Sequence, residues 1–139
     1  MMLVKDLGNN QSWYVYHRSV GNTHYGQLNS TGQFYDDAGP WNDTTPTSTV
    51  FTLGTPGHLN YNGYNYVAYI FAHNEAEFGQ NSDEAIIHCG SYLGNSAGSA
   101  TTDQSITLGF EPQWILIKKY EGGIGSWSIF DNMRGVISD

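Results

Sequence analysis

The segment YDDAGPWND, residues 35–43, gathers the strongest set of potential ligand-binding side chains in the chain. Carboxylate and amide oxygens from a loop are the hard ligands that Ca²⁺ requires. Aromatic rings beside carboxylates also suit a sugar, because a ring stacks on the apolar face of a pyranose while the acids accept hydrogen bonds from its hydroxyl groups. The predicted ligand-binding residues are Tyr35, Asp37, Trp41 and Asp43, and the weaker candidate calcium ligands are Asp36, Asp37, Asn42 and Asp43.

The same segment has an interpretation without a ligand. A solvated acidic loop would pack Trp41 on the edge of the fold and use Asp43 to cap the following turn. The spacing also lacks the bidentate glutamate of an EF-hand loop, which weakens the case for calcium. No cofactor is therefore predicted, and calcium is kept only as a candidate.

A second candidate site is the aromatic loop HLNYNGYNY, residues 58–66. Tyr61 and Tyr64 would form an exposed platform, with the neighbouring asparagines as hydrogen-bonding partners, because Tyr and Asn are common in adaptable recognition surfaces. The alternative is that both tyrosines cover the edge of a sheet and pack within their own hairpin. The residue pattern favours neither interpretation over the other.

The sequence contains no catalytic motif. Its five histidines show no H-x-H or H-E-x-x-H spacing, and no G-x-S-x-G nucleophile elbow occurs. Glycoside hydrolysis needs paired carboxyl groups, one with a raised pKa, whereas the clustered acids lie in polar segments where solvation is expected. The clustered acids are Glu75, Glu77, Asp83, Glu84 and Glu111. We therefore predict that the protein is not an enzyme.

The charge of the chain limits its partners. The formal net charge is −8, and only five Lys and Arg residues are scattered over 139 positions. Nucleic-acid backbones require clustered basic residues, so nucleic acid is not an expected partner, and anionic membrane surfaces are disfavoured for the same reason. The single Cys89 excludes an internal disulfide, and we expect a buried structural thiol there.

Membrane and secretion signals are not expected. The start MMLVKDLGNN has no apolar core of signal-peptide length, and no apolar run reaches the roughly 18 residues of a membrane span. We therefore predict no membrane insertion and no signal peptide.

The residue pattern predicts an all-β protein. Aromatic residues make up 14% of the chain, and 17 glycines accompany many Asn, Ser and Thr residues, a composition that suits strands and tight turns. Short runs of alternating apolar and polar residues predict an antiparallel sandwich or barrel with little or no helix. The most apolar run, 64–73, is expected in the centre of a sheet, and a short helical turn fits only 72–85. The other predicted strands are 2–5, 13–17, 24–29, 49–53, 85–92, 105–109, 114–119 and 127–131.

Two stretches of the chain repeat one pattern. MLVKDLGNNQSWYVYHRSVG (2–21) and ILIKKYEGGIGSWSIFDNMRG (115–135) each run from an apolar strand ending in lysine, through a Gly-containing turn, to Ser-Trp and a second strand. Each stretch predicts a β-hairpin. Lys118 follows Lys5 by 113 residues. We therefore expect a single domain over 1–139, made of one repeat unit of about that length and the first hairpin of a following unit, 114–139.

Several longer segments resemble a known family. SWYVYHRSVGNTHYGQLNSTG, WNDTTPTSTVFTLGT, NYVAYIFA and LGFEPQWILIKK follow one another as in a repeated β-sandwich domain of phage tail-fibre and other virion proteins, described as lectin-like or concanavalin-like. The resemblance covers essentially the whole chain. It implies a jelly-roll-type sandwich, a place on the surface of a virion or other extracellular particle, other virion subunits as partners and, by analogy with fibres, a homotrimer. It supplies no catalytic or ligand-binding residues.

Three functions compete at this point. The first is a non-enzymatic virion domain that binds a cell-surface carbohydrate or receptor, and the second is a purely architectural spacer or decoration domain. A small glycan-cleaving enzyme ranks third. For assembly, we expect the two repeated hairpins to lie in equivalent positions of two sheets or to compete for one position that a neighbouring subunit can share.

Overall fold

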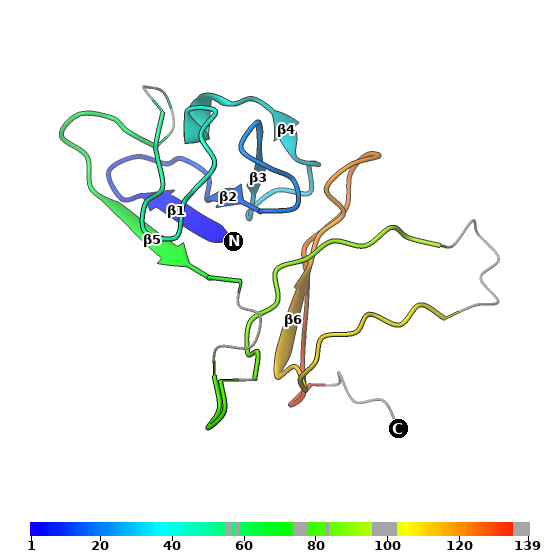
Figure 1. Cartoon of the computed structure of the whole chain (residues 1–139). Coiled ribbons are helices and arrows are strands. Elements are labelled where there is room, and N and C mark those ends of the chain that lie inside the picture. The colour runs from blue at the N-terminus through cyan, green and yellow to red at the C-terminus, as the bar shows by residue number, and fades with distance from the viewer. Residues whose placement is uncertain (55–56, 58, 74–77, 83, 96–102, 135–139) are drawn as a thin grey trace.

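A computed structural model describes residues 1–54, 57, 59–73, 78–82, 84–95 and 103–134 (Figure 1). These residues form antiparallel strands joined by loops, with a 3₁₀ turn, η1, at Gly39–Trp41. The prediction of an all-β antiparallel fold is confirmed, and the jelly-roll arrangement implied by the resemblance stays a prediction. The described helical turn lies at η1 and not in 72–85, where residues 74–77 and 83 are outside the described residues.

The larger sheet has five strands. They are β1 (Met2–Asp6), β2 (Tyr14–Tyr16), β3 (His24–Gln27), β4 (Tyr35–Asp36) and β5 (Tyr66–Ile70). The strands β1 to β4 form a meander and β5 returns beside β1, which gives the order β4-β3-β2-β1-β5. This return resembles the connection of a Greek key. The prediction that 64–73 is central is wrong, because β5 lies at the edge of the sheet formed by the described residues.

The hydrophobic core lies on one face of this sheet. Burial alternates along β1, with Met2, Val4 and Asp6 buried, as the two-residue period of a strand requires. The η1 turn and the loop after it cover this face. The predicted strand 49–53 is part of that loop, so its assignment as a strand is wrong. The core comprises Met2, Val4, Tyr14, Tyr16, Trp41 and Leu59, with Tyr25, Phe51, Leu53 and Tyr66 packed against it.

The end of β1 is stabilised by a buried carboxylate. Asp6 is only 1% exposed, and its Oδ1 accepts hydrogen bonds from the backbone N–H groups of Gly8, at 2.7 Å, and Asn9, at 3.2 Å. The Asn9 side chain donates to Oδ2 at 3.0 Å. Burial acts to raise the pKa of Asp6, but these hydrogen bonds outweigh it, so the pKa lies below its usual value. The charged side chain therefore fixes the turn between β1 and β2.

The second sheet is a hairpin of β6 (Trp114–Ile117) and β7 (Ser128–Asp131). Both strands are predictable from the sequence, β6 from a short apolar run and β7 from its mixture of polar and apolar residues after Ser-Trp. The described residues of the predicted strands 85–92 and 105–109 are not in strands, so these two assignments are wrong. Neither face of β7 is buried, because Ile129 is 61% and Phe130 46% exposed.

The two repeated stretches adopt the same hairpin. In the first, the residue before the lysine lies opposite the residue after the tryptophan, Val4 opposite Tyr14. In the second, the same two positions pair, Ile117 with Ser128. The register is therefore identical, although the turn of the second hairpin is one residue longer. The end of the second stretch, residue 135, lies outside the described residues.

Each hairpin is also closed by its lysine. Lys5 Nζ donates to the carbonyl oxygen of Gln11 at 2.6 Å, and Lys118 Nζ donates to that of Gly125. Both acceptors lie two residues before the tryptophan of their hairpin. The repeated lysine thus supplies a charge-assisted hydrogen bond that ties each turn to the preceding strand.

The surroundings of the two hairpins differ. β1 and β2 are flanked by β5 and β3, whereas β6 and β7 form a two-stranded sheet with no third strand in the described part of the chain. The hairpins therefore have different strand partners. This difference counts against the expectation that they take equivalent positions or compete for one.

The second hairpin packs on the first sheet through its turn (Figure 1). The Trp127 indole N–H donates to the carbonyl oxygen of Gln27 at 2.9 Å, and the Phe34 N–H donates to that of Tyr120 at 2.9 Å. Lys118 also donates to the carbonyl oxygen of Ser30 at 3.4 Å. These contacts place residues 118–127 beside β3, β4 and the loop between them.

Candidate functional site

A partly open pocket lies where the second hairpin meets the larger sheet. Its volume is about 450 Å³, within the range of small-molecule sites. The β2–β3 turn, the β3–β4 region and the turn between β6 and β7 all contribute to it. The lining residues are Ser19, Val20, His24, Gln33, Phe34, Asp36, Tyr120 and Glu121.

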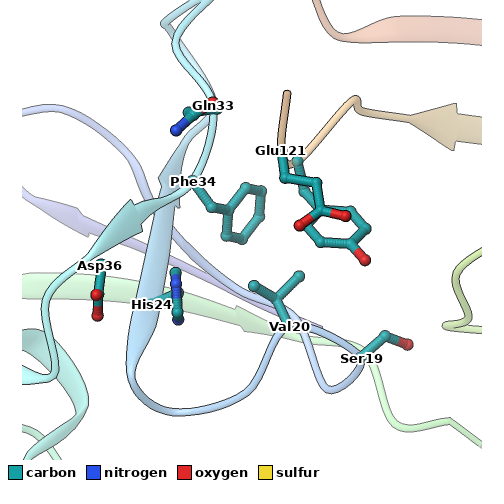
Figure 2. Close-up of a pocket in the computed structure, with 8 residues that line it drawn as sticks. Ser19, Val20, His24, Gln33, Phe34, Asp36 and Glu121 are labelled. Carbon is teal, nitrogen blue, oxygen red and sulfur yellow. The ribbon is translucent and has the colours of Figure 1, made fainter. Parts of the chain in front are cut away.

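Apolar and polar groups are separated in this pocket. Figure 2 shows Phe34 and Val20 in the middle of the lining, with His24 and Asp36 on one side and Glu121 on the other. This arrangement offers an apolar surface flanked by hydrogen-bonding side chains. It suits a ligand that has an apolar face and a polar rim.

Phe34 is held in place by close backbone contacts. Its side chain packs on Gly26 so closely that a Cβ atom at that position would lie 2.6 Å from the Phe34 ring. The residue is 5% exposed, and its ring centroid lies 6.4 Å from that of Trp127. The glycine in β3 is therefore required for the position of the aromatic ring in the pocket.

The polar side of the pocket is set by strand pairing. His24 on β3 lies opposite Asp36 on β4. The His24 ring nitrogen Nδ1 lies 2.9 Å from the Thr23 hydroxyl oxygen, and the backbone oxygen of His24 accepts a hydrogen bond from the Trp41 indole at 3.0 Å. The core residue Trp41 therefore helps to fix β3 beneath the pocket.

The structure places Trp41 in the core and not on a binding surface. Its exposure is 0%, and its ring meets that of Tyr16 edge-on at 5.6 Å. A platform for a sugar needs an open ring face, so the assignment of Trp41 as a stacking residue is corrected here. Pro40 and Trp41 are buried together because η1 folds this part of the acidic loop over the sheet.

The acids of residues 35–43 point to different partners. Asp37 Oδ1 accepts the backbone N–H of Gly39 at 2.8 Å, and Asp43 Oδ1 accepts a hydrogen bond from the Asn22 side chain at 2.9 Å. Asp36 lines the pocket instead. Within the described residues, no three His, Cys, Asp or Glu side chains form a group that could hold a metal ion. The acidic members of the candidate calcium set, Asp36, Asp37 and Asp43, therefore form no such group. The fourth candidate, Asn42, caps the end of η1.

Tyr35 is the exposed end of an aromatic row across the sheet. It is 40% exposed and stacks on Tyr25 at 5.2 Å, which in turn contacts Tyr14 at 4.9 Å. Burial, with the neighbouring Tyr25 as a smaller cause, raises the pKa of Tyr14 to about 12. The row is mainly structural, and Tyr35 is the one member of the three that is exposed.

Tyr61 and Tyr64 form the second predicted site as a compact pair. Their rings meet edge-on at 5.9 Å, and the Tyr61 N–H donates to the Tyr66 hydroxyl at 3.0 Å. Tyr64 is 44% exposed and packs over Gly8, where a Cβ atom would lie 2.1 Å from its ring. The pair is therefore both packed within its loop and partly open to solvent.

Of the predicted site residues, the pocket contains only Asp36. The other lining residues escaped sequence reasoning because three separate segments bring them together. The one sequence feature that could have indicated Tyr120 and Glu121 is the repeat, because it predicts that 118–127 belongs to a hairpin. The repeat does not predict where that hairpin packs. Among the acids considered for hydrolysis, Glu84 and Glu111 are exposed, and Glu75, Glu77 and Asp83 lie outside the described residues.

The comparison with known families spans this whole arrangement. A family model described as "Domain of unknown function (DUF7483)" matches residues 1–138, both hairpins included. The chain belongs to the DUF7483 family. No curated protein and no solved structure matches it. In the described residues of this DUF7483 domain, no helix is long and apolar enough to cross a membrane.

Proposed function

We propose that this DUF7483 domain binds carbohydrate, without chemical turnover, in the pocket between the larger sheet and the second hairpin. The observation that carries the proposal is the lining of this pocket, where the half-buried Tyr120 lies among Asp36, Gln33 and Glu121, with the buried Phe34 also in the lining. Sugar rings have apolar C–H faces that pack on aromatic side chains, and their hydroxyl groups donate hydrogen bonds to carboxylates. The open form of the pocket suits the end of a glycan chain.

The charge of the pocket narrows the class of glycan. Among the described residues, Asp36 and Glu121 line it and no Lys or Arg does, and the chain carries a net charge of −8. Anionic polysaccharides would be repelled. The preferred ligands are therefore neutral sugars.

The biological setting of the proposal is a phage virion, with a bacterial cell-surface glycan as the receptor. Its support is the sequence resemblance to tail-fibre domains, whose place on the particle surface suits receptor binding. A broader receptor-binding role would use the same pocket.

A binding assay with matched variants tests the proposal. The 139-residue chain would be applied to an array of neutral and anionic bacterial surface polysaccharides. Asp36→Asn and Glu121→Gln should each weaken binding to a neutral glycan by about tenfold, the effect of losing a hydrogen bond to a charged group. The exposed Glu111→Gln is the control and should bind as the wild type does.

Other outcomes of this assay are informative. Binding that is lost in Tyr64→Ala and kept in Glu121→Gln would move the site to the Tyr61–Tyr64 pair. Release of reducing ends from a bound glycan would contradict a non-enzymatic role. No binding to any glycan would contradict the proposal and favour the architectural alternative.

The architectural alternative has an observation of its own. The chain contains two hairpins of identical register, and repetition of this kind is typical of modules that stack along a fibre. A purely structural domain would stack its repeats without needing an open pocket.

A further inference from the structure

The second hairpin ends in a strand whose outer edge lacks a partner in the described part of the chain. We propose that this edge of β7 pairs with β7 of a second copy of the chain. The result is a four-stranded sheet of order β6-β7-β7-β6, centred on a two-fold axis. This interface is separate from the glycan pocket and does not depend on it.

The internal repeat indicates what belongs on this edge. β7 occupies the position that β2 has in the first hairpin, and Ile129 corresponds to Val15, since each lies two residues after the tryptophan. The outer edge of β2 is covered by the antiparallel strand β3, with Val15 opposite Gly26. The equivalent edge of β7 therefore has the geometry to take an antiparallel strand.

The backbone of β7 points the required groups outward. The Asn132 N–H donates across the hairpin to the carbonyl oxygen of Gln113 at 3.1 Å. Because hydrogen-bonded pairs alternate in an antiparallel ladder, Phe130 also faces β6, and the N–H and C=O of Ile129 face the open edge. The first hairpin shows the same alternation, since the N–H of Leu28 donates to the carbonyl oxygen of Trp13 on the β3 side at 3.1 Å.

The side chains of β7 do not block the pairing of another strand with this edge. Ile129 is 61% and Phe130 46% exposed, and β7 contains none of the Lys or Pro residues that commonly block edge pairing. Its one charged residue, Asp131, is half-buried and paired with Arg134. The edge strand β4 is different, because it is two residues long and includes the exposed Asp36. A two-stranded hairpin is also only marginally stable by itself, so added strands would stabilise β6 and β7.

A second copy of β7 can fill this open edge, and the pairing requires no other part of the surface. A two-fold axis perpendicular to the sheet generates an antiparallel neighbour, and each residue at its centre meets its own copy. Centred on Ile129, this pairing places Phe130 opposite Ser128 of the partner subunit and Asp131 opposite Trp127 of the partner subunit. No like charges then lie opposite each other. A three-fold axis cannot pair β7 with itself in this way, so the proposal is a dimer and not the trimer implied by fibre analogy.

The solution mass and one backbone substitution test this proposal. Light scattering over a wide concentration range should show twice the 15.4 kDa mass of one chain. Ile129→Pro should give a monomer, because it removes an outward N–H while leaving the β6–β7 ladder intact, and proline is tolerated where its N–H would face away from the partner strand. Ile124→Ser removes another exposed isoleucine, in the turn of the same hairpin, and should stay dimeric.

Hydrogen exchange measured on the wild type gives a second test, which does not depend on whether Ile129→Pro folds. Exchange of the Ile129 amide in the wild type should slow as the protein concentration rises, while exchange at Phe130, already paired with β6, should change far less. A single-chain or trimeric mass at every concentration would overturn the proposal. So would a dimer that survives Ile129→Pro, or an Ile129 amide whose exchange is independent of concentration.

Discussion

At the scale of single residues, Trp41 has the clearest assigned role. It is fully buried, contacts Tyr16 and donates to the backbone of His24. Trp41→Ala should lower the free energy of unfolding by about 3–5 kcal/mol, the usual cost of deleting a buried aromatic ring. Urea unfolding followed by circular dichroism measures this. Trp114→Ala removes a tryptophan that is 50% exposed and should cost about 1 kcal/mol or less, and equal losses would contradict the core role of Trp41.

His17 should make stability depend on pH. Burial, with smaller effects from the terminal amine and Arg18, lowers the pKa of His17 to about 4, and its Nδ1 accepts the Ser19 N–H at 3.3 Å, which requires the neutral ring. Between pH 6.5 and 4 the unfolded chain binds a proton that the folded chain does not. Stability should therefore be complete above pH 6.5 and fall by roughly 1–2 kcal/mol toward pH 4, after allowance for partial solvent exposure.

A neutral substitution isolates this contribution. His17→Gln keeps a hydrogen-bond acceptor and should flatten the difference in unfolding free energy between pH 7 and 5. An NMR titration of the wild type gives the pKa of His17 directly. An ordinary histidine pKa near 6.5 would refute this explanation.

At the scale of elements, the second hairpin depends on Lys118. Its ammonium group joins the turn at Gly125 to the loop at Ser30, and burial lowers its pKa. Lys118→Met should cost about 1–2 kcal/mol, because it removes hydrogen bonds made by a charged donor. Faster amide exchange at Gly125 would show where the turn loosens.

Its chain neighbour provides the control for this prediction. Lys119 is exposed and donates only within the turn, to the carbonyl oxygen of Gly122 at 2.6 Å. Lys119→Met should change stability by less than about 0.5 kcal/mol. If the two substitutions had the same effect, Lys118 would not be the residue that fixes the hairpin to the larger sheet.

Gly26 in β3 leaves the space that the pocket residue Phe34 occupies. A methyl group at this position would meet the Phe34 ring at 2.6 Å, so Gly26→Ala should displace Phe34 and weaken glycan binding while the sheet remains folded. Gly8→Ala, which should displace Tyr64 in the same way, is the matched control and should not affect binding at the pocket. Glycan titrations monitored by calorimetry compare the two variants, and the opposite ranking would contradict this pocket assignment.

Local pattern was sufficient to predict some elements and insufficient for others. The two hairpins are predictable from the short apolar runs that end at Lys5 and Lys118, the turns after them and the repeated Ser-Trp positions, because register within a hairpin is a local property. The strand predicted for Phe51 and Leu53 is wrong, because the alternation of apolar residues that predicts a strand also suits a loop that covers a core. The pocket could not be predicted, because its lining comes from contacts between segments separated by about 90 residues, such as Gly123 with Gln33.

At the scale of the whole molecule, buried and exposed apolar residues are unevenly distributed. Among the described residues, Cys89 is the only buried hydrophobic residue after Leu59, whereas exposed ones continue through Phe78, Leu93 and Ile129. Single exposed apolar residues are common on protein surfaces, so the informative feature is that nearly all buried hydrophobic residues in the described part of the chain precede residue 60. This distribution agrees with a stable amino-terminal sheet that carries a second hairpin available for binding and assembly.

The central claim is that the pocket between the larger sheet and the second hairpin binds a neutral sugar. Two-dimensional ¹H–¹⁵N NMR of the full chain, titrated separately with glucose, galactose, mannose and N-acetylglucosamine, tests it most directly. We predict saturable shift changes for at least one sugar at Gln33, Phe34, Tyr120 and Glu121, with little change at Tyr61 and Tyr64. No saturable change with any of the four sugars, or changes confined to the Tyr61–Tyr64 loop, would contradict the claim.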